Sequence, residues 1–521
     1  MTDDSVRDQY EAFPYPERDP DDERKRLITG SPSKPEEIDH FIFDGSRDWS
    51  APFRVLVAGG GTGDGLIQLA TRLAEAGRSA EITYLDLSSS SRKVAEARAA
   101  VRGLSGITFL TGSLLDAPEL GQFDYIDCCG VLHHLPDPAA GTTALAAALA
   151  PGGGIGFMVY APYGRSGVYP LQEAYNTLFG DLPPEEKLSA AKAVQERLPA
   201  GHPFRLNPHL GDHHTSDAGF FDLLLHSRDR AYSVADLLSL LDAGGLSLSG
   251  FCQPVRYDLS RFAARPDGMP REETWALAEA LSGTIKTHVG YAVHKSESRG
   301  PASWATGDKV PVLQGDRQQV ARAVAKTGRL PLKLDGISAE MRLPKDAARI
   351  FSALDGRRSL AEIGAGTGID PVAFRTLWAR LAPLSDWGLL HYSNLNRVCG
   401  SHSQCGFVHI QHCFLFSNVV RLTLAQSDDL AHDLCVVAPT LGLGHHLLLL
   451  IGDIALLGFQ PFEPLDELAQ FIGCDPILGL GGIVGEAGIG HLLLRKRDGR
   501  VAILSAARGP VASPLGLQEE A

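Results

Sequence analysis

The 521-residue sequence lacks most of the features that mark secreted, membrane or disulfide-stabilised proteins. Eight cysteines are too few for a disulfide framework in a chain of this length, so free thiols are expected. The first residues form neither a basic nor an apolar segment, so no secretory signal is expected. Apolar runs stay short of the ~20 residues that a transmembrane helix needs. These absences predict a cytoplasmic protein without a membrane partner.

Positive charge is also scarce, because the formal net charge is −14 and residues 422–490 contain nine Asp and Glu but no Lys or Arg. An acidic chain is repelled by a phosphate backbone, so nucleic acid is not an expected partner. The composition changes near residue 396, which leaves residues 396–521 as an unassigned extension. It begins with a cluster of metal-ligating residue types, namely Cys399, His402, Cys405, His409, His412 and Cys413. Their spacing does not match C-x₂-C pairs, so no metal is predicted, and a zinc site is the alternative.

Short apolar runs alternate with helical patterns between residues 53 and 160. Strands are expected at 54–58, 82–85, 107–110, 125–129 and 155–160, and a late strand at 284–293. Strands and helices that alternate in this way favour an α/β fold with a doubly wound, mostly parallel sheet. The expected organisation is an N-terminal arm or lid at 1–50, this α/β domain at 51–300, a linker at 301–330, a small module at 331–395 and the extension.

The strongest local signal is the glycine loop after the first strand, with Gly59, Gly61 and Gly63 directly before a helix. Glycines let the backbone turn sharply and let a ligand lie against the main chain. Asp64 stands where the dinucleotide-binding fingerprint G-x-G-x-x-G needs its last glycine, so this fingerprint is not matched. No G-K-[ST] follows the loop, which excludes a P-loop. Asp86 ends the second strand, where a carboxylate can accept ribose hydroxyls. The sequence Gly130-Val131-Leu-His133-His134 follows a later strand.

This order of motifs resembles the class I S-adenosylmethionine-dependent methyltransferases, closely over residues 50–160 and loosely over 1–300. The resemblance also uses Phe123-Asp-Tyr125, the Leu149–Gly154 segment and the Tyr10-x-x-Phe13-Pro-Tyr15-Pro segment, which is typical of a bacterial multi-domain group. It implies S-adenosylmethionine as the cofactor and a methyl acceptor, protein or small molecule, that the sequence does not identify. The implied cofactor-binding residues are Gly59, Gly61, Gly63, Asp86, Leu87, Ser113, Leu114, Gly130 and Val131. The sequence departs from the family at Val57, where an acid is common.

Methyl transfer needs a general base only when the acceptor atom carries a proton. The candidates for this catalytic role are His133, His134, Tyr160 and His226; ordinary packing and hydrogen bonding are the alternative for each of them. The segment Phe13–Pro16 is a candidate lid over the site. A non-catalytic regulator that binds S-adenosylmethionine and a nucleotide-cofactor oxidoreductase are the competing functions.

A second glycine motif, Gly364-Ala-Gly366-Thr-Gly368, is rejected as a cofactor loop because a turn rather than a buried strand precedes it. Helical stripes around it resemble a winged helix-turn-helix module over residues 331–394. The expected recognition helix, 371–384, carries only two arginines, so we favour regulatory or protein–protein use over DNA binding. The oligomeric state is not predicted.

Overall fold

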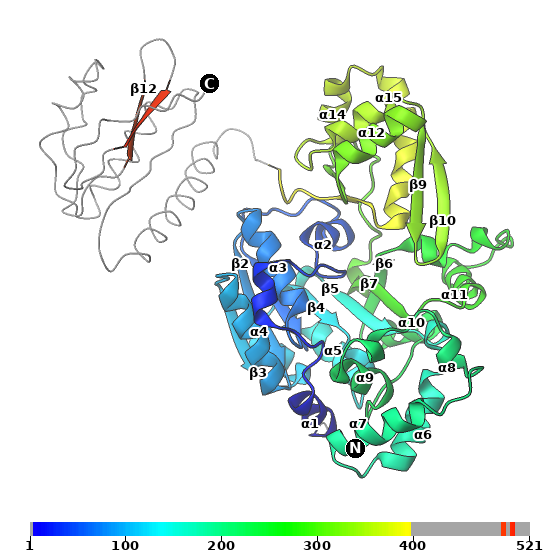
Figure 1. Ribbon diagram of the computed structural model, residues 1–521. Coiled ribbons are helices and arrows are strands. Elements are labelled where there is room, and N and C mark those ends of the chain that lie inside the picture. The colour runs from blue at the N-terminus through cyan, green and yellow to red at the C-terminus, as the bar shows by residue number, and fades with distance from the viewer. Residues whose placement is uncertain (1–3, 398–490, 496–500, 506–521) are drawn as a thin grey trace, which may run out of the picture. The chain divides into compact units, whose positions relative to one another are not determined.

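The computed structural model describes residues 4–397, 491–495 and 501–505 (Figure 1). The chain divides into two compact units, residues 1–397 and 398–521. The described part of the second unit is one antiparallel hairpin of β12 (His491–Arg495) and β13 (Val501–Ser505). The Cys/His cluster at 399–413 lies outside the described residues. Among the residues that are described, no helix is long and apolar enough to cross a bilayer.

A seven-stranded sheet in the order β3-β2-β1-β4-β5-β7-β6 forms the centre of the first unit. Its strands are β1 (Phe53–Ala58), β2 (Ala80–Asp86), β3 (Ile107–Thr111), β4 (Phe123–Cys129), β5 (Leu149–Tyr160), β6 (Leu246–Phe251) and β7 (Thr287–His294). The first five strands are parallel, and β7 is antiparallel to both β5 and β6. The predicted α/β fold with a mostly parallel sheet is confirmed. The strand expected at 155–160 begins earlier, because β5 starts at Leu149.

Both faces of the sheet are covered, as a parallel sheet requires (Figure 1). Successive side chains of a strand point to opposite faces, so Leu56 lies in one core and Val55 and Val57 lie in the other. The first core is completed by α5 (Pro138–Ala147) and α10 (Val234–Ala243). The second is completed by α2 (Pro35–Ile42), α3 (Asp64–Glu75) and α4 (Ser89–Val101).

The helix α2 corrects the expectation that residues 1–50 are an arm. Ile38 and Ile42 are fully buried against the sheet, so this helix is part of the main core. Only the segment before it, with α1 (Asp4–Ala12), crosses over other elements as an arm would. The burial of α2 was missed because its apolar positions are few and separated by acids.

Residues 161–232 form a helical insertion between β5 and α10, with an apolar core of its own. Its helices are α6 (Val168–Phe179), α7 (Pro184–Gln195), α8 (Pro203–Leu206) and α9 (Asp217–Leu224). Phe13 from the N-terminal segment stacks on Phe221 of α9, with ring centroids 4.9 Å apart. The insertion and the N-terminal segment therefore meet through apolar side chains. After β6, α11 (Arg271–Ser282) precedes β7.

The small module begins earlier than predicted. Its elements are β8 (Pro311–Leu313), α12 (Arg317–Thr327), β9 (Arg329–Leu334), β10 (Ile337–Arg342), α13 (Ala347–Ala353), α14 (Leu360–Thr367), α15 (Pro371–Leu381) and β11 (Leu390–Tyr392). The 301–330 linker was wrong over residues 311–327, because β8 pairs with β11 and α12 contributes Val324 to the module's core. The rejection of the second glycine motif is confirmed, since α14 runs through Gly364 and Gly366. The winged-helix resemblance stays a prediction.

Asp39 of α2 joins the sheet domain to the small module. Its fully buried carboxylate accepts hydrogen bonds from the Arg47 backbone N–H (3.0 Å) and the Trp49 indole (3.0 Å). It also accepts from the Ser393 hydroxyl (2.8 Å) and the Asn394 backbone N–H (2.9 Å), just after β11. Each buried donor that loses its acceptor costs about 1–3 kcal/mol.

We therefore expect Asp39→Ala to lower the free energy of unfolding by on the order of 3 kcal/mol, measured by chemical denaturation. Asp48→Ala is the control, because Asp48 accepts hydrogen bonds only locally from the exposed Ser50. Equal losses in the two variants would contradict the joining role of Asp39.

Asp127 of β4 predicts a pH dependence of stability. Burial raises the pKa of this carboxyl to about 6, although hydrogen bonds from Ser33 and Tyr125 oppose the shift. The folded state thus holds the proton more tightly than the unfolded state. The resulting stabilisation is present below pH ~4 and is lost as the pH rises through about 6.

Asp127→Asn cannot ionise, so its stability relative to the unmodified protein should increase between pH 4 and pH 7, by up to about 3 kcal/mol. Denaturation curves of both proteins across this range measure the difference. A constant difference would contradict the raised pKa.

Candidate functional site

The glycine loop connects β1 to α3, and three of its glycines have left-handed backbone: Gly59 (φ 71°), Gly61 (φ 52°) and Gly63 (φ 100°). Gly59 also lies in close contact with another part of the chain. A Cβ at this position would overlap both methyl carbons of Val131, in the turn after β4. The loop and the turn can therefore meet only because residue 59 has no side chain.

Asp86, at the end of β2, braces this loop. Its carboxylate accepts the backbone N–H of Gly61 (2.7 Å) and that of Ser88 (2.8 Å), one on each oxygen. Burial raises the pKa of this carboxyl, and the two backbone hydrogen bonds oppose the rise. Each oxygen keeps a further lone pair, so the carboxylate can still accept hydroxyl groups of a ligand.

The other predicted cofactor-binding residues follow the ends of neighbouring parallel strands. Leu87 follows β2, and Gly130 and Val131 follow β4. Ser113 and Leu114 follow β3, where the Ser113 hydroxyl accepts the Leu115 backbone N–H and Leu114 is buried. The structure thus brings the set to one edge of the sheet, where ligands of open α/β sheets bind. Their individual roles stay predictions.

All four predicted catalytic residues come together in one buried cluster beside that edge. His133 and His134 form the turn after β4, Tyr160 ends β5, and His226 follows α9. The rings of His134 and His226 stack with centroids 3.7 Å apart, and those of His133 and Tyr160 are 4.0 Å apart. Since Val131 contacts Gly59, the cluster lies next to the glycine loop.

Four further residues complete the cluster and were not predicted as site residues: Tyr10, Arg165, Asp222 and Asp229. Asp222 accepts hydrogen bonds from the hydroxyls of Tyr10 and Tyr160, both at 3.0 Å. Arg165 pairs with Asp229 at 2.9 Å and lies 3.6 Å from the centroid of the Tyr160 ring. The sequence contained one signal for Asp222, which is the single acid within the apolar run 218–226. An acid in such a run is expected to be buried, and a buried acid needs partners.

Burial determines the protonation of the cluster. It lowers the pKa of His133 and of His226 well below the usual value, with the neighbouring His134 adding to both shifts. It raises the pKa of Tyr160 and of Asp222. At neutral pH, His133 and His226 are therefore neutral imidazoles and Tyr160 keeps its proton.

The N-terminal segment is fastened over the glycine loop. The Thr62 hydroxyl donates to the carbonyl oxygen of Pro16 (2.6 Å). Arg18 makes two hydrogen bonds to the Asp64 carboxylate, Nε to Oδ1 at 2.9 Å and Nη2 to Oδ2 at 2.6 Å. Tyr15 and Pro16 of the predicted lid thus lie on the loop, while the role of the lid in excluding water stays a prediction.

The helix α1 reaches both ends of the site through adjacent residues. The Glu11 carboxylate accepts from the Ser90 hydroxyl (2.6 Å) and backbone N–H (3.2 Å) at the start of α4. The Tyr10 hydroxyl donates to Asp222 and lies 3.2 Å from Nε2 of His226. One helix turn thereby links the cofactor edge to the histidine cluster.

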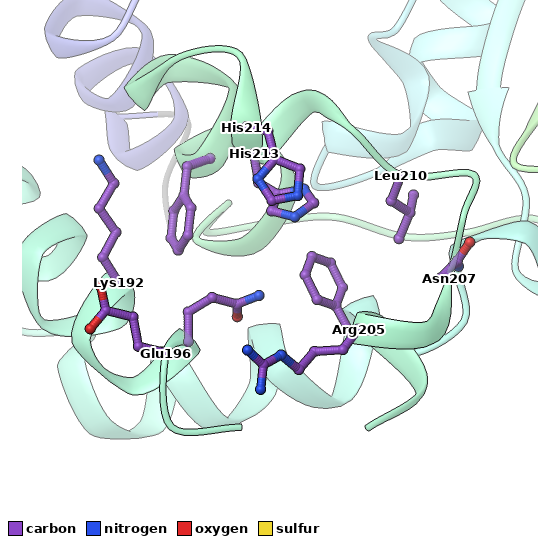
Figure 2. Close-up of a pocket in the computed structure, with 10 residues that line it drawn as sticks. Lys192, Glu196, Arg205, Asn207, Leu210, His213 and His214 are labelled. Atoms are coloured by element: carbon purple, nitrogen blue, oxygen red, sulfur yellow. The ribbon is translucent and has the colours of Figure 1, made fainter. Parts of the chain in front are cut away.

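The insertion also carries an open pocket of about 390 Å³ between α7, α8 and α9 (Figure 2). Its lining includes Lys192, Glu196, Arg205, His213 and His214, and none of the predicted site residues lies in it. Burial lowers the pKa of His213 to about 4, and the adjacent His214 adds to the shift. The pocket is separate from the sheet edge.

We expect Gly59→Ala to weaken binding of S-adenosylmethionine, the ligand that the motifs predict, by more than tenfold. The added methyl group meets Val131 and favours a different backbone conformation, so the loop must move. Isothermal titration calorimetry measures the affinity. Gly103→Ala is the control, because Gly103 has a similar φ (65°) but open space around its Cβ position. An unchanged affinity in Gly59→Ala would contradict the tight contact.

Comparisons with known proteins agree with this geometry. Residues 56–155 match the family model described as a methyltransferase domain. An uncharacterized protein of Synechococcus sp. is 34% identical over 256 residues, which cover 47% of this chain and 60% of that protein. A ubiquinone biosynthesis O-methyltransferase of Albidiferax ferrireducens is 33% identical over 99 residues, or 19% of this chain and 38% of that protein.

The chain therefore spans less than two thirds of the length of either relative. Among solved structures, PKMT2 from Rickettsia typhi is similar with a TM-score of 0.49 and 13% identity, over 71% of this chain and 76% of that chain. The family match includes the glycine loop, Asp86 and the His133–His134 turn. Residues 56–155 are thus a methyltransferase domain, as the motifs predicted.

Proposed function

We propose that this protein transfers the methyl group of S-adenosylmethionine to an N or O atom of an acceptor, which is a protein or a small molecule. One observation carries the proposal. The contact between Val131 and Gly59 places the predicted cofactor loop directly beside the buried cluster of His133, His134, Tyr160 and His226. The predicted cofactor-binding residues and the candidate general bases therefore lie side by side.

In this proposal, the glycine loop holds the methionine and ribose parts of the cofactor, and Asp86 accepts the ribose hydroxyls. The transferred methyl group is already activated by the sulfonium. The main task of the protein is then in-line positioning, for which effective molarities reach about 10⁵–10⁸ M. The N-terminal segment, fastened by Arg18 and Thr62, supplies a cover for the loop.

The cluster offers groups of distinct character toward an acceptor. His133 is neutral and both of its ring nitrogens are buried without a hydrogen-bond partner. In His226, by contrast, both ring nitrogens are engaged, Nδ1 by the Arg228 backbone N–H and Nε2 by Tyr10. His133 therefore keeps both ring nitrogens for a ligand, and His226 acts as a positioning residue for the N-terminal helix.

This arrangement favours an enzyme over a regulator that only senses S-adenosylmethionine. Burying several histidines and carboxylates beside a ligand costs free energy unless they are paired. A sensor needs no such groups at the methyl end of its ligand. A general base could contribute about 10²–10⁴-fold to the rate if the acceptor atom carries a proton.

The proposal is tested in two steps with the full-length protein. Calorimetry should detect binding of S-adenosylmethionine, and Asp86→Ala should weaken it by about 10–100-fold because hydrogen bonds to a charged acceptor are lost. Asp137→Ala is the matched control, since Asp137 caps α5 after the neighbouring strand β4 by accepting the Ala140 backbone N–H.

Transfer of a labelled methyl group to components of a cell lysate then separates enzyme from sensor. Label that appears in a protein or small-molecule fraction supports the proposal and identifies the class of acceptor. Binding without any transfer would favour the regulator, and an absence of binding would exclude both functions.

A further inference from the structure

The histidine cluster contains buried nitrogen and oxygen atoms that have no hydrogen-bond partner among the described residues. Both ring nitrogens of His133 and the Oδ1 atom of Asp229 are inaccessible to solvent and have no hydrogen-bond partner. The His133 side chain is 1% exposed, and that of Asp229 is fully buried. Buried polar groups without partners are rare, and an ion or a ligand is one of their ordinary explanations.

The hydrogen bonds around His134 leave its second nitrogen available. Nδ1 of His134 lies 2.8 Å from the carbonyl oxygen of Arg228, which can only accept, so Nδ1 carries the proton. In the neutral ring, the lone pair is then on Nε2. A backbone carbonyl on the far nitrogen is the usual arrangement around a metal-bound histidine, because it sets the tautomer and the ring orientation.

The same reasoning disfavours His226 and Asp222 as ligands. Nδ1 of His226 accepts the Arg228 backbone N–H at 3.0 Å, so Nε2 carries the proton and donates toward the Tyr10 hydroxyl. Each carboxylate oxygen of Asp222 accepts a tyrosine hydroxyl, whereas Oδ1 of Asp229 has no hydrogen-bond partner. Two groups of possible ligands occur among the described residues, and the one made of His133, His134 and Asp229 contains the buried atoms without hydrogen-bond partners.

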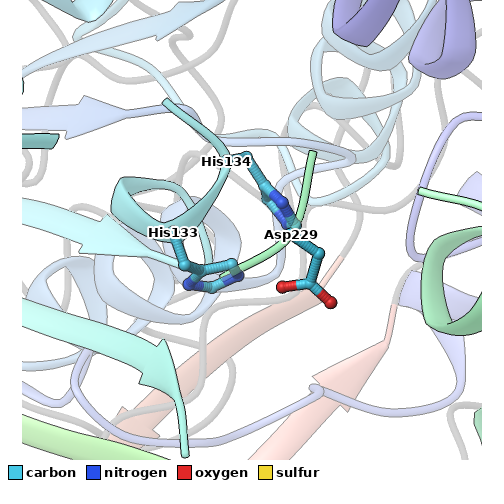
Figure 3. Close-up of side chains that lie close together, drawn as sticks. All are labelled: His133, His134 and Asp229. Carbon is cyan, nitrogen blue, oxygen red and sulfur yellow. The ribbon is translucent and has the colours of Figure 1, made fainter. Parts of the chain in front are cut away.

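We propose that His133, His134 and Asp229 form a binding site for a divalent transition-metal cation. Figure 3 shows the three side chains converging from the turn after β4 and from the segment after α9. One possible ligand atom from each residue, a ring nitrogen or a carboxylate oxygen, lies within 4.8 Å of those of the other two. Tetrahedral zinc with bonds of ~2.1 Å places its ligands about 3.4 Å apart, so small ring rotations close the site.

The donor set and its surroundings define the kind of cation. Two imidazoles and one carboxylate suit Zn²⁺ or Fe²⁺ and leave at least one coordination position open, whereas Mg²⁺ prefers oxygen ligands. Asp229 is oriented through its other oxygen by Arg165 and by Gln172, each at 2.9 Å. Because Arg165 offsets the charge of Asp229, the two imidazoles rather than the carboxylate favour a transition metal over Mg²⁺. This site goes beyond methyl transfer and does not depend on it.

Cobalt titration of the chelator-stripped, full-length protein tests the proposal. Co²⁺ bound by two imidazoles and a carboxylate shows visible d–d bands without thiolate-to-metal charge transfer, which separates this site from any site that uses cysteines. We expect one equivalent of such Co²⁺, displaced by Zn²⁺ and not by Mg²⁺. His133→Gln and Asp229→Asn should each weaken it by more than tenfold.

His213→Ala/His214→Ala is the matched control, because it removes an adjacent pair of histidines in the insertion and leaves the cluster intact. Melting curves of every variant check folding, and His133→Gln keeps a side chain of similar size if Asp229→Asn unfolds. Bands that persist unchanged in both cluster variants, or thiolate bands alone, would overturn the proposal; the orphaned atoms would then bind water. The titration contains no cofactor, so its result is independent of methyl transfer.

Discussion

The contact between Gly59 and Val131 is the constraint on which the site depends. It brings the loop after β1 against the turn after β4, two neighbouring strands of the parallel sheet. A side chain at residue 59 would separate them, and the residues that follow Val131 would move with the turn. The glycine loop and the histidine cluster are adjacent because one residue has no Cβ.

Buried polar groups make the rest of the arrangement specific. Asp86 holds the glycine loop through backbone N–H groups, and Asp222 holds Tyr10 of the N-terminal helix beside Tyr160. Asp39 does the same between the sheet domain and the small module. Each of these carboxylates is costly to bury, and each is satisfied by donors from separate segments of the chain. His133 and Asp229 are exceptions, which makes them informative about a ligand.

Much of the sheet could be predicted because its strands are continuous apolar runs bounded by turn residues. The helix α4 followed equally from local rules, since Ser88 caps it through the Ser91 backbone N–H. Two helices of the first unit illustrate what could not be predicted. The helix α2 is short and has acids between its apolar residues, and α12 reads as polar surface although Val324 is fully buried. The burial of α2 depends on partners more than 200 residues away in the sequence, such as Tyr291. The burial of α12 depends on how the small module packs.

At the site, the sequence by itself determined the parallel sheet, the glycine loop and the strand-end residues Asp86, Val131 and His133, because these follow from local patterns with a fixed meaning. His226 was also among the predicted candidates for a general base. Only the tertiary structure decided that Tyr10, Arg165, Asp222 and Asp229 join them. A buried charge acquires its role from the groups that surround it, and those groups come from α1, the helical insertion and β5. No local pattern records which of these segments will meet.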